Sequence, residues 1–274
     1  MAPKVAVVGH VEWVEFARVP HVPVAGEILH ASDFFAVPAG GGPVTAVQLR
    51  KLAGQCTFFT ALGDDELGRQ TEQGLRDLGL RVEARFRPTA QRRAFTYLDD
   101  QGERTITVMG ERLGPGGDED LPWDDLAGYD AVYFTAGDPA ALRRARAAHV
   151  VVAALRAKAV LLEAGVRLDA VIGSSRDAGE VYEPIEPPPG VVVLTESSAG
   201  GSWSADDGRT GRWQPVPPPG SPADAYGCGD SFAGGLTYGL GAGMTIEGAL
   251  ELGAVCGAVC ATGHGPYEHQ HTLA

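Results

Sequence analysis

The sequence predicts an α/β fold in which a mostly parallel sheet is covered by helices on both faces. Short β-branched runs such as Val5–Val8 and Val191–Thr195 alternate with longer helical patterns, and this alternation is typical of parallel sheets. The 274 residues suffice to bury a core without disulfide or metal support. The 38 glycines and 19 prolines indicate many tight turns, which argues against a helical bundle.

The first half of the chain shows the alternation with two interruptions. Apolar runs that end in glycine are read as buried strands, and the helices follow glycine or acidic starts. Two segments look like β-strands with one exposed face, and we expect them to pair as a small second sheet. The predicted elements are a strand at 5–8, β-segments within 11–36, a helix opened by 40–43 and stopped at Gly54, a strand at 56–61, a helix at about 66–78 and β-segments within 82–108 with a turn at 99–102.

The second half continues the alternation to the end of the chain. Its clearest late strand is rich in valine, and its last helical region is rich in small residues. The predicted elements are a strand at 131–135, a helix at 139–157, a strand at 160–162, a short segment from 171, a strand at 191–195, a loop or hairpin over 201–222, and a helical region from Gly227 to about Cys260 with a break near Gly241.

Composition excludes several classes of protein. Lysine and arginine number 22 and aspartate and glutamate 35, so the net charge is −13 and no basic nucleic-acid footprint is visible. No apolar run is long enough for a membrane span, and the N-terminus lacks a signal-peptide layout, so a cytoplasmic location is expected. The four cysteines form no C-x-x-C pair. We expect small packing residues, and a metal or redox pair is the alternative.

The segment from Asp224 to Gly235 contains the most informative chemistry. Its glycines flank a helix start, where unpaired N–H groups and a partial positive charge attract anions. The absence of side chains at Gly227 and Gly229 lets an anion reach those N–H groups. Asp230 in the first helical turn could then accept a proton from a hydroxyl that attacks a phosphate. An ordinary helix start with an acidic first turn is the alternative.

This segment resembles the second signature of the PfkB-type, ribokinase-like carbohydrate kinases. Further resemblances follow in the family's order at 40–46, 61–68, 99–104 and 195–201. The resemblance implies a single domain over 1–274, with a three-layer α/β/α body and a small β-sheet lid formed by about 11–36 and 82–108. Because no G-x-x-x-x-G-K-[ST] segment occurs, a P-loop kinase is not supported.

The resemblance also implies roles for individual residues. Asp230 is the expected general base, and the amides of Gly227, Cys228 and Gly229 form the expected anion hole. ATP is the expected phosphoryl donor, with Mg²⁺ held largely through water and a monovalent cation such as K⁺ in some members. The residues expected on the nucleotide side are Thr195, Glu196, Gly200, Asp224 and His264, and those expected on the sugar side are Glu12, Gly41, Gly42 and Thr45.

The chain departs from the family pattern at three places. Thr45 replaces an asparagine that often contacts the sugar. Glu12 is the best substitute for a missing sugar-binding aspartate, and a solvated charge at the lid edge is its alternative. The family's Asn-x-x-Glu is reduced to Ser174 and Asp177. We expect Asp177 to act on the metal through water or, alternatively, to cap a helix.

The predicted function is phosphoryl transfer from ATP to a hydroxyl of a sugar or a sugar-containing small molecule. A nucleoside kinase of the same fold is one alternative, and a ligand-binding or regulatory homologue with weakened catalysis is another. Glu12 and the lack of an evident cationic cluster favour a neutral polyol over a phosphosugar. A homodimer through the lid edges is also expected, since exposed strand edges seek partners.

Overall fold

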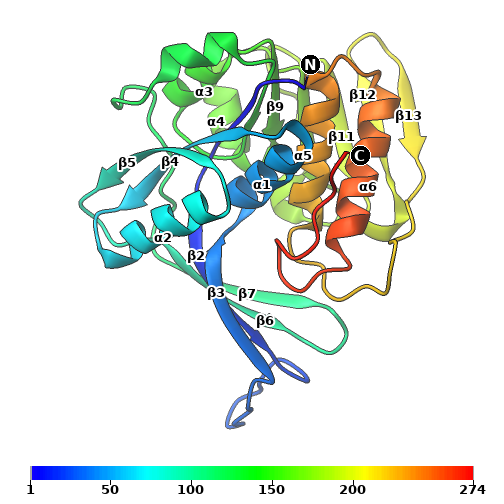
Figure 1. Ribbon diagram of the computed structural model, residues 1–274. Coiled ribbons are helices and arrows are strands. Elements are labelled where there is room, and N and C mark those ends of the chain that lie inside the picture. The colour runs from blue at the N-terminus through cyan, green and yellow to red at the C-terminus, as the bar shows by residue number, and fades with distance from the viewer. Residues whose placement is uncertain (1, 274) are drawn as a thin grey trace.

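The computed structural model describes residues 2–273, which form two β-sheets (Figure 1). The larger sheet has nine strands in the order β13-β12-β11-β10-β9-β8-β1-β4-β5, and only β12 and β13 run antiparallel to their neighbours. Its strands are β1 (Val5–Val8), β4 (Cys56–Gly63), β5 (Arg81–Arg87), β8 (Ala131–Phe134), β9 (Val150–Ala154), β10 (Ala170–Ser174), β11 (Val191–Thr195), β12 (Gly201–Ala205) and β13 (Thr210–Trp213).

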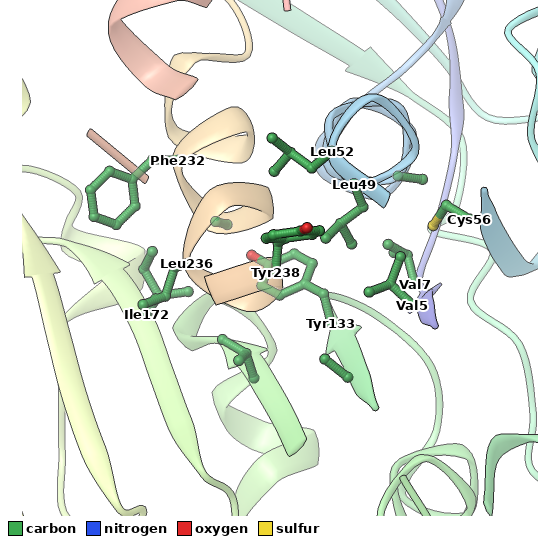
Figure 2. Packing of buried hydrophobic residues seen from close by; sticks show 14 of the residues in the cluster. Val5, Val7, Leu49, Leu52, Cys56, Tyr133, Ile172, Phe232, Leu236 and Tyr238 are labelled. Carbon is green, nitrogen blue, oxygen red and sulfur yellow. The ribbon is translucent and has the colours of Figure 1, made fainter. Parts of the chain in front are cut away.

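Helices cover both faces of this sheet, as the alternation predicted. The helices are α1 (Gly41–Ala53), α2 (Glu66–Asp77), α3 (Pro139–Ala145), α4 (Lys158–Ala164), α5 (Cys228–Gly241) and α6 (Ile246–Cys260). Val5 and Val7 of β1 pack in one core with α1, α5 and α6, whereas Ala6 and Val8 pack in a second core with α3 and α4. Figure 2 shows the first core, where Leu49 of α1 lies beside the tyrosines of β8 and α5. Because successive side chains alternate between faces, β1 is apolar throughout.

The smaller sheet projects from the body (Figure 1). Its order is β3-β2-β6-β7, with β2 at Glu12–Arg18, β3 at Asp33–Ala39, β6 at Arg93–Leu98 and β7 at Arg104–Met109. Val14 and Phe16 of this sheet pack against Val44 of α1 and Tyr226 before α5. The apolar face of the sheet therefore covers the beginnings of α1 and α5, and we call this sheet the lid. The predicted fold class is confirmed.

Two predicted boundaries differ from the structure. The range 82–108 is divided, because β5 pairs in parallel with β4 in the large sheet and only β6 and β7 join the lid. The helix predicted over 139–157 ends at Ala145 and is followed by β9, while the strand predicted at 160–162 lies inside α4. The error over 139–157 arises because the apolar run 150–154 is almost entirely buried, which gives no periodicity to separate strand from helix.

The burial expected of the cysteines is found for three of the four. Cys56, Cys256 and Cys260 are buried, Cys228 is half-buried, and all four are free thiols. Within residues 2–273, each helix is too short or too polar to cross a lipid bilayer.

Candidate active site

The order in which the chain adds strands to the large sheet reverses between β1 and β8. From β1 the chain fills β4 and β5 on one side and later fills β8 to β11 on the other. In parallel α/β sheets, ligands bind beyond the carboxyl ends of the strands at such a reversal. Gly9 follows β1 and Thr135 follows β8, and a Cβ atom at Gly9 would lie 2.4 Å from Thr135 Cγ2. The topology therefore predicts a ligand site next to these two residues, beyond the carboxyl ends of β1 and β8.

Helices α1 and α5 both begin at this point. The residues before them, Gly40 and Gly227, have φ angles of 97° and 81°, which favour glycine, and neither helix has a side-chain cap. The Thr45 hydroxyl donates a hydrogen bond of 3.0 Å to the backbone carbonyl of Asp230, which ties the two helices together. Thr45 is fully buried. Its hydroxyl positions α5, and its expected contact with a sugar stays a prediction.

The first turn of α5 has unpaired amides and an open position at Gly229. Within residues 2–273, the amides of Gly227, Cys228 and Gly229 have no hydrogen-bond acceptor. A Cβ atom at Gly229 would have no neighbour within 4 Å, whereas one at Gly227 would lie 2.9 Å from Val44 Cγ1. Gly227 therefore serves the backbone turn and packing, and Gly229 leaves room for a ligand. The arrangement matches the expected anion hole, because unpaired amides at a helix start attract negative charge.

Asp230 lies beside these amides, in the first turn of α5. A Cβ atom at Gly41 would be 3.0 Å from Asp230 Oδ1, so the glycine keeps the space before this carboxylate free. Gly42 instead packs against the backbone, since its Cβ atom would be 2.5 Å from the His10 carbonyl oxygen. Burial raises the pKa of Asp230 to about 6, with Arg104 opposing the increase. A carboxylate with this pKa suits general-base catalysis near neutral pH.

Glu12 and His10 form a polar wall beside Gly40. Glu12 is buried, and its Oε1 accepts a hydrogen bond of 2.6 Å from Arg92 Nε and lies 3.8 Å from His10 Nε2. Burial lowers the pKa of His10 to about 3, and the charges of Arg112 and Arg92 lower it as well. His10 is therefore neutral, and its buried Nδ1 has no partner within residues 2–273. The alternative of a solvated Glu12 at the lid edge is wrong.

Asp177 and Glu180 lie at the 3₁₀ helix η3 (Ala178–Glu180), after β10. Asp177 Oδ1 accepts a hydrogen bond of 2.8 Å from the Gly179 amide, so Asp177 caps this short helix. This amide and Arg156 hold the pKa of Asp177 below its usual value. Arg156 Nη2 also lies 3.1 Å from Glu180 Oε1, and Glu180 Oε2 accepts a hydrogen bond from the Ser174 amide. The capping role of Asp177 is therefore present in the structure.

The residues expected on the nucleotide side lie at and after the end of β11. Thr195 Oγ1 donates a hydrogen bond of 3.3 Å to the Gly173 carbonyl. Glu196 forms two hydrogen bonds to Arg212, at 3.0 and 2.6 Å, and these bonds lower its pKa. Gly200 has a φ of 83°, and a Cβ atom there would lie 2.2 Å from the Trp213 carbonyl oxygen. Gly200 is thus required by the turn into β12.

Asp224 and His264 are brought together by the C-terminal segment. Asp224 is buried, and its two oxygens accept hydrogen bonds from the amides of Tyr226 and Gly265, at 2.9 and 2.8 Å. These bonds hold the loop before α5 against the residues after α6. His264 itself is exposed, with Nδ1 3.4 Å from Glu268 Oε2. Asp224 therefore organises the start of α5, while its expected contact with a nucleotide remains a prediction.

Comparison with known proteins identifies the family. A family model described as pfkB family carbohydrate kinase matches residues 2–162 and 173–273. The chain belongs to the PfkB family. A fructokinase of Vibrio alginolyticus is 26% identical over 271 residues, covering 82% of this chain and 86% of that protein. The predicted family and its enzyme class, phosphotransfer to an alcohol group, are confirmed.

Solved structures share the ribokinase-like fold of this PfkB-family protein. A microbiome-derived acarbose kinase superposes with a TM-score of 0.79 at 21% identity, covering 99% of this chain and 97% of the other. The ribokinase of Arabidopsis thaliana complexed with ribose and ATP has a TM-score of 0.77 at 16% identity, with 98% and 96% covered. Both likenesses concern the fold.

Several polar residues at the site of this PfkB-family protein were not predicted. They come from single positions in separate segments, and only Arg104 lies within a segment, 99–104, that resembles the family. The negative net charge also gave no sign that arginines would gather here. The missed residues are Thr135 after β8, Glu180 in η3, and the arginines at 92, 104 and 156.

The pKa of Asp230 predicts how the activity of this PfkB-family kinase depends on pH. A base must be ionised to accept a proton, and the raised pKa means that the carboxylate is ionised only above about pH 6. We expect kcat/KM to fall about tenfold per pH unit below that value. Initial rates between pH 5 and 8 would check this prediction. A flat profile across that range would contradict the assignment of Asp230.

Proposed function

We propose that this PfkB-family kinase transfers the γ-phosphoryl group of ATP to a hydroxyl of a sugar or a sugar-containing small molecule. The observation that supports this proposal most directly is the placement of Asp230 beside three unpaired amides at the start of α5. The carboxylate can accept a proton, and the amides can hold an anion less than one helical turn away. A kinase of an alcohol needs both functions at one point.

In the proposed reaction, the acceptor hydroxyl lies between Gly41 and Asp230. Asp230 accepts the hydroxyl proton as the acceptor oxygen forms a bond to the γ-phosphorus. The bond from this phosphorus to the β–γ bridging oxygen breaks, and ADP leaves with that electron pair. The amides of Gly227 to Gly229 stabilise the negative charge on the phosphoryl oxygens. Gly41 contributes by leaving space, and Thr45 contributes by fixing Asp230 relative to α1.

Glu12, Arg92 and His10 are the groups proposed to contact the acceptor. The second carboxylate oxygen of Glu12, Oε2, lies beside Gly40. A Cβ atom added at Gly40 would be 3.8 Å from this oxygen. A carboxylate oxygen accepts hydrogen bonds from sugar hydroxyls, and the ion pair with Arg92 orients the carboxylate. Neutral His10 can donate from one ring nitrogen and accept at the other. This wall suits a polyhydroxylated acceptor.

The described residues fit a magnesium ion only if their side chains hold it through water and do not coordinate it directly. Residues 2–273 contain no group of three metal-ligating side chains. Asp177 and Glu180 form a carboxylate pair at η3, and both already bind Arg156. Mg²⁺ dehydrates reluctantly and is usually held by substrate phosphates and water, so these carboxylates would order its water. When bound, the ion neutralises charge on the phosphates.

A monovalent cation fits this chain less well. The resemblance places it near Gly263 to Gly265, where the Gly265 amide donates to Asp224, whose other carboxylate oxygen accepts the Tyr226 amide. Arg18 Nη2 also lies 3.8 Å from Asp224 Oδ2 and supplies a positive charge there. We therefore propose no step that depends on K⁺.

The test is a coupled assay of ADP release over a panel of acceptors. The panel contains fructose, ribose, adenosine, a sugar acid and a sugar phosphate, the last two because arginines line the site. Turnover with a neutral sugar and Mg-ATP is the expected result. Turnover with adenosine alone would support the nucleoside-kinase alternative.

A thermal-shift screen of the same compounds accompanies the assay, because a ligand of the folded state raises the unfolding midpoint. Saturable binding of a sugar without any consumption of ATP would contradict the proposed kinase and favour a ligand-binding homologue. The homodimer through the lid stays a prediction. Its candidate surface is β7, the last strand of the lid sheet, whose six residues are all exposed.

A further inference from the structure

Asp224 is a buried carboxylate directly before the anion hole. Its side chain has no exposed surface, and its two oxygens accept the amides of Tyr226 and Gly265, at 2.9 and 2.8 Å. The first of these bonds fixes the loop that ends at Gly227, where α5 begins. The second ties this loop to the segment that follows α6. The position of the anion-hole amides therefore depends on this carboxylate.

Aromatic rings of the lid help to shield this carboxylate from water. Phe16 of β2 stacks on Phe35 of β3, with ring centroids 4.7 Å apart, and meets the ring of Tyr226 edge-on at 4.8 Å. A Cβ atom at Gly265 would lie 2.7 Å from Phe35 Cζ, so this glycine lets the ring lie directly on the segment that donates to Asp224. In such surroundings a negative charge without a counter-ion is costly, because water cannot solvate it.

Arg18, the last residue of β2, brings a positive charge to this carboxylate. Its Nη2 lies 3.8 Å from Asp224 Oδ2. Within residues 2–273, Asp224 has no other cationic side chain at ion-pair distance, and Arg18 has no other acidic one. Arg18 Nη2 is itself buried and forms no hydrogen bond in this part of the chain. The two groups therefore depend on each other for charge compensation.

We propose that Arg18 is a positioning residue whose guanidinium serves as the internal counter-ion of Asp224 and holds the anion-hole loop in place without a bound monovalent cation. The role in catalysis rests on the proposed function. The resemblance to the family implies K⁺ in some members, but a second cation near Asp224 would be repelled by the guanidinium in this chain. Because Arg18 belongs to the lid and Asp224 to the body, the same pair ties the lid to the loop before α5.

The experiment compares wild type with Arg18→Gln, Arg18→Lys and a double variant that combines Arg18→Gln with Asp224→Asn. Each protein is measured in potassium chloride and in tetramethylammonium chloride of equal ionic strength. Arg93→Gln is the matched control, because Arg93 also lies in the lid and pairs with an acidic residue of the lid, Glu15. The measurements are the thermal unfolding midpoint, the affinity for Mg-AMPPNP, an ATP analogue that keeps a γ-phosphate, and kcat with the best acceptor of the panel. The unfolding midpoint does not depend on turnover.

For wild type and for Arg93→Gln we expect kcat values that agree within about twofold between the two salts. In tetramethylammonium chloride, Arg18→Gln leaves the buried carboxylate without a counter-ion. Its midpoint should be lower by about 4 °C or more, and its kcat and Mg-AMPPNP affinity lower by about tenfold. K⁺ should restore most of each loss, because it can enter the space that the guanidinium leaves. Arg18→Lys should recover part of each loss in either salt, and the double variant should not respond to K⁺, since its residue 224 has no charge.

A wild-type kcat more than about tenfold higher in potassium chloride would overturn the inference. Wild-type values for Arg18→Gln in both salts would overturn it as well. Losses that neither K⁺ nor Arg18→Lys relieves would leave Arg18 as a packing contact of the lid and would also contradict its role as a counter-ion. If wild type binds no nucleotide, the proposed function fails, while the midpoints still test the pair of Arg18 and Asp224.

Discussion

Replacing Asp230 with asparagine is expected to lower kcat by about 10³-fold or more, because the variant cannot accept the acceptor's proton. The amide has nearly the same shape, and the Thr45 hydroxyl bonds to the backbone carbonyl of residue 230, which the change leaves intact. The unfolding midpoint should therefore not fall. Binding of Mg-ATP should be as tight as in wild type or tighter, since a negative charge near the anion hole is removed.

The measurement is single-turnover kinetics with the best acceptor, together with calorimetry for Mg-AMPPNP. Asp124→Asn is the matched control, because the Asp124 side chain is 99% exposed and lies in the 3₁₀ helix η1 (Trp123–Gly128), next to α3. It should have wild-type kinetics. If Asp230→Asn keeps more than about a tenth of wild-type kcat, the group is not the general base.

Replacing Gly68 with alanine is expected to destabilise the protein by about 3 kcal/mol or more, a large value for a single methyl group. A Cβ atom at Gly68 would lie 1.9 Å from the Gly63 carbonyl oxygen, and backbone cannot yield as a flexible side chain does. Relief of the clash would move α2 away from β4. It would also break the hydrogen bond of 2.7 Å from the Gly68 amide to Asp65.

Gly248 in α6 provides a close control. Both glycines are the third residue of their helix, and both donate their amide to the side chain of the capping residue, Asp65 or Thr245. A Cβ atom at Gly248 would have its nearest contact at 3.6 Å. Gly248→Ala should therefore be neutral or stabilise by up to about 1 kcal/mol. Urea unfolding of the two variants would decide. Equal stabilities would contradict the steric explanation for Gly68.

The Asp65 cap shows how much of a motif can be interpreted from the sequence alone. The sequence placed Gly63, Asp65 and Gly68 at a strand end through their resemblance to the family. The structure adds that Asp65 Oδ2 also accepts the Gln91 amide, and that the Gln91 side chain accepts the Gly63 amide. This network joins the body to the segment that leads from β5 into the lid strand β6. Gln91 carries no sequence signal, because its partners lie 26 and 28 residues away.

The same difference between a local motif and contacts from distant segments is seen at the active site. Asp230 and its glycines could be recognised because a helix start, an anion hole and a base must lie within a few consecutive residues. Glu180 and Arg104 could not, since they reach Asp230 from η3 and from the lid. Thr45 shows the same limit. Its place in the motif is visible in the sequence, but the direction of its hydroxyl depends on how α1 packs against α5.

The sequence by itself determined the layers, the family and the short motif that contains the proposed base, because periodicity and local spacing are properties of consecutive residues. Only the tertiary structure decided which strand joins which sheet, which side chains lie at the carboxyl ends of β1 and β8, and which arginines remain without an acidic partner. Those features depend on contacts between residues in separate elements, such as Arg92 with Glu12 and Arg104 with Ala225. Burial and charge at such contacts are set by packing, and no local pattern records them.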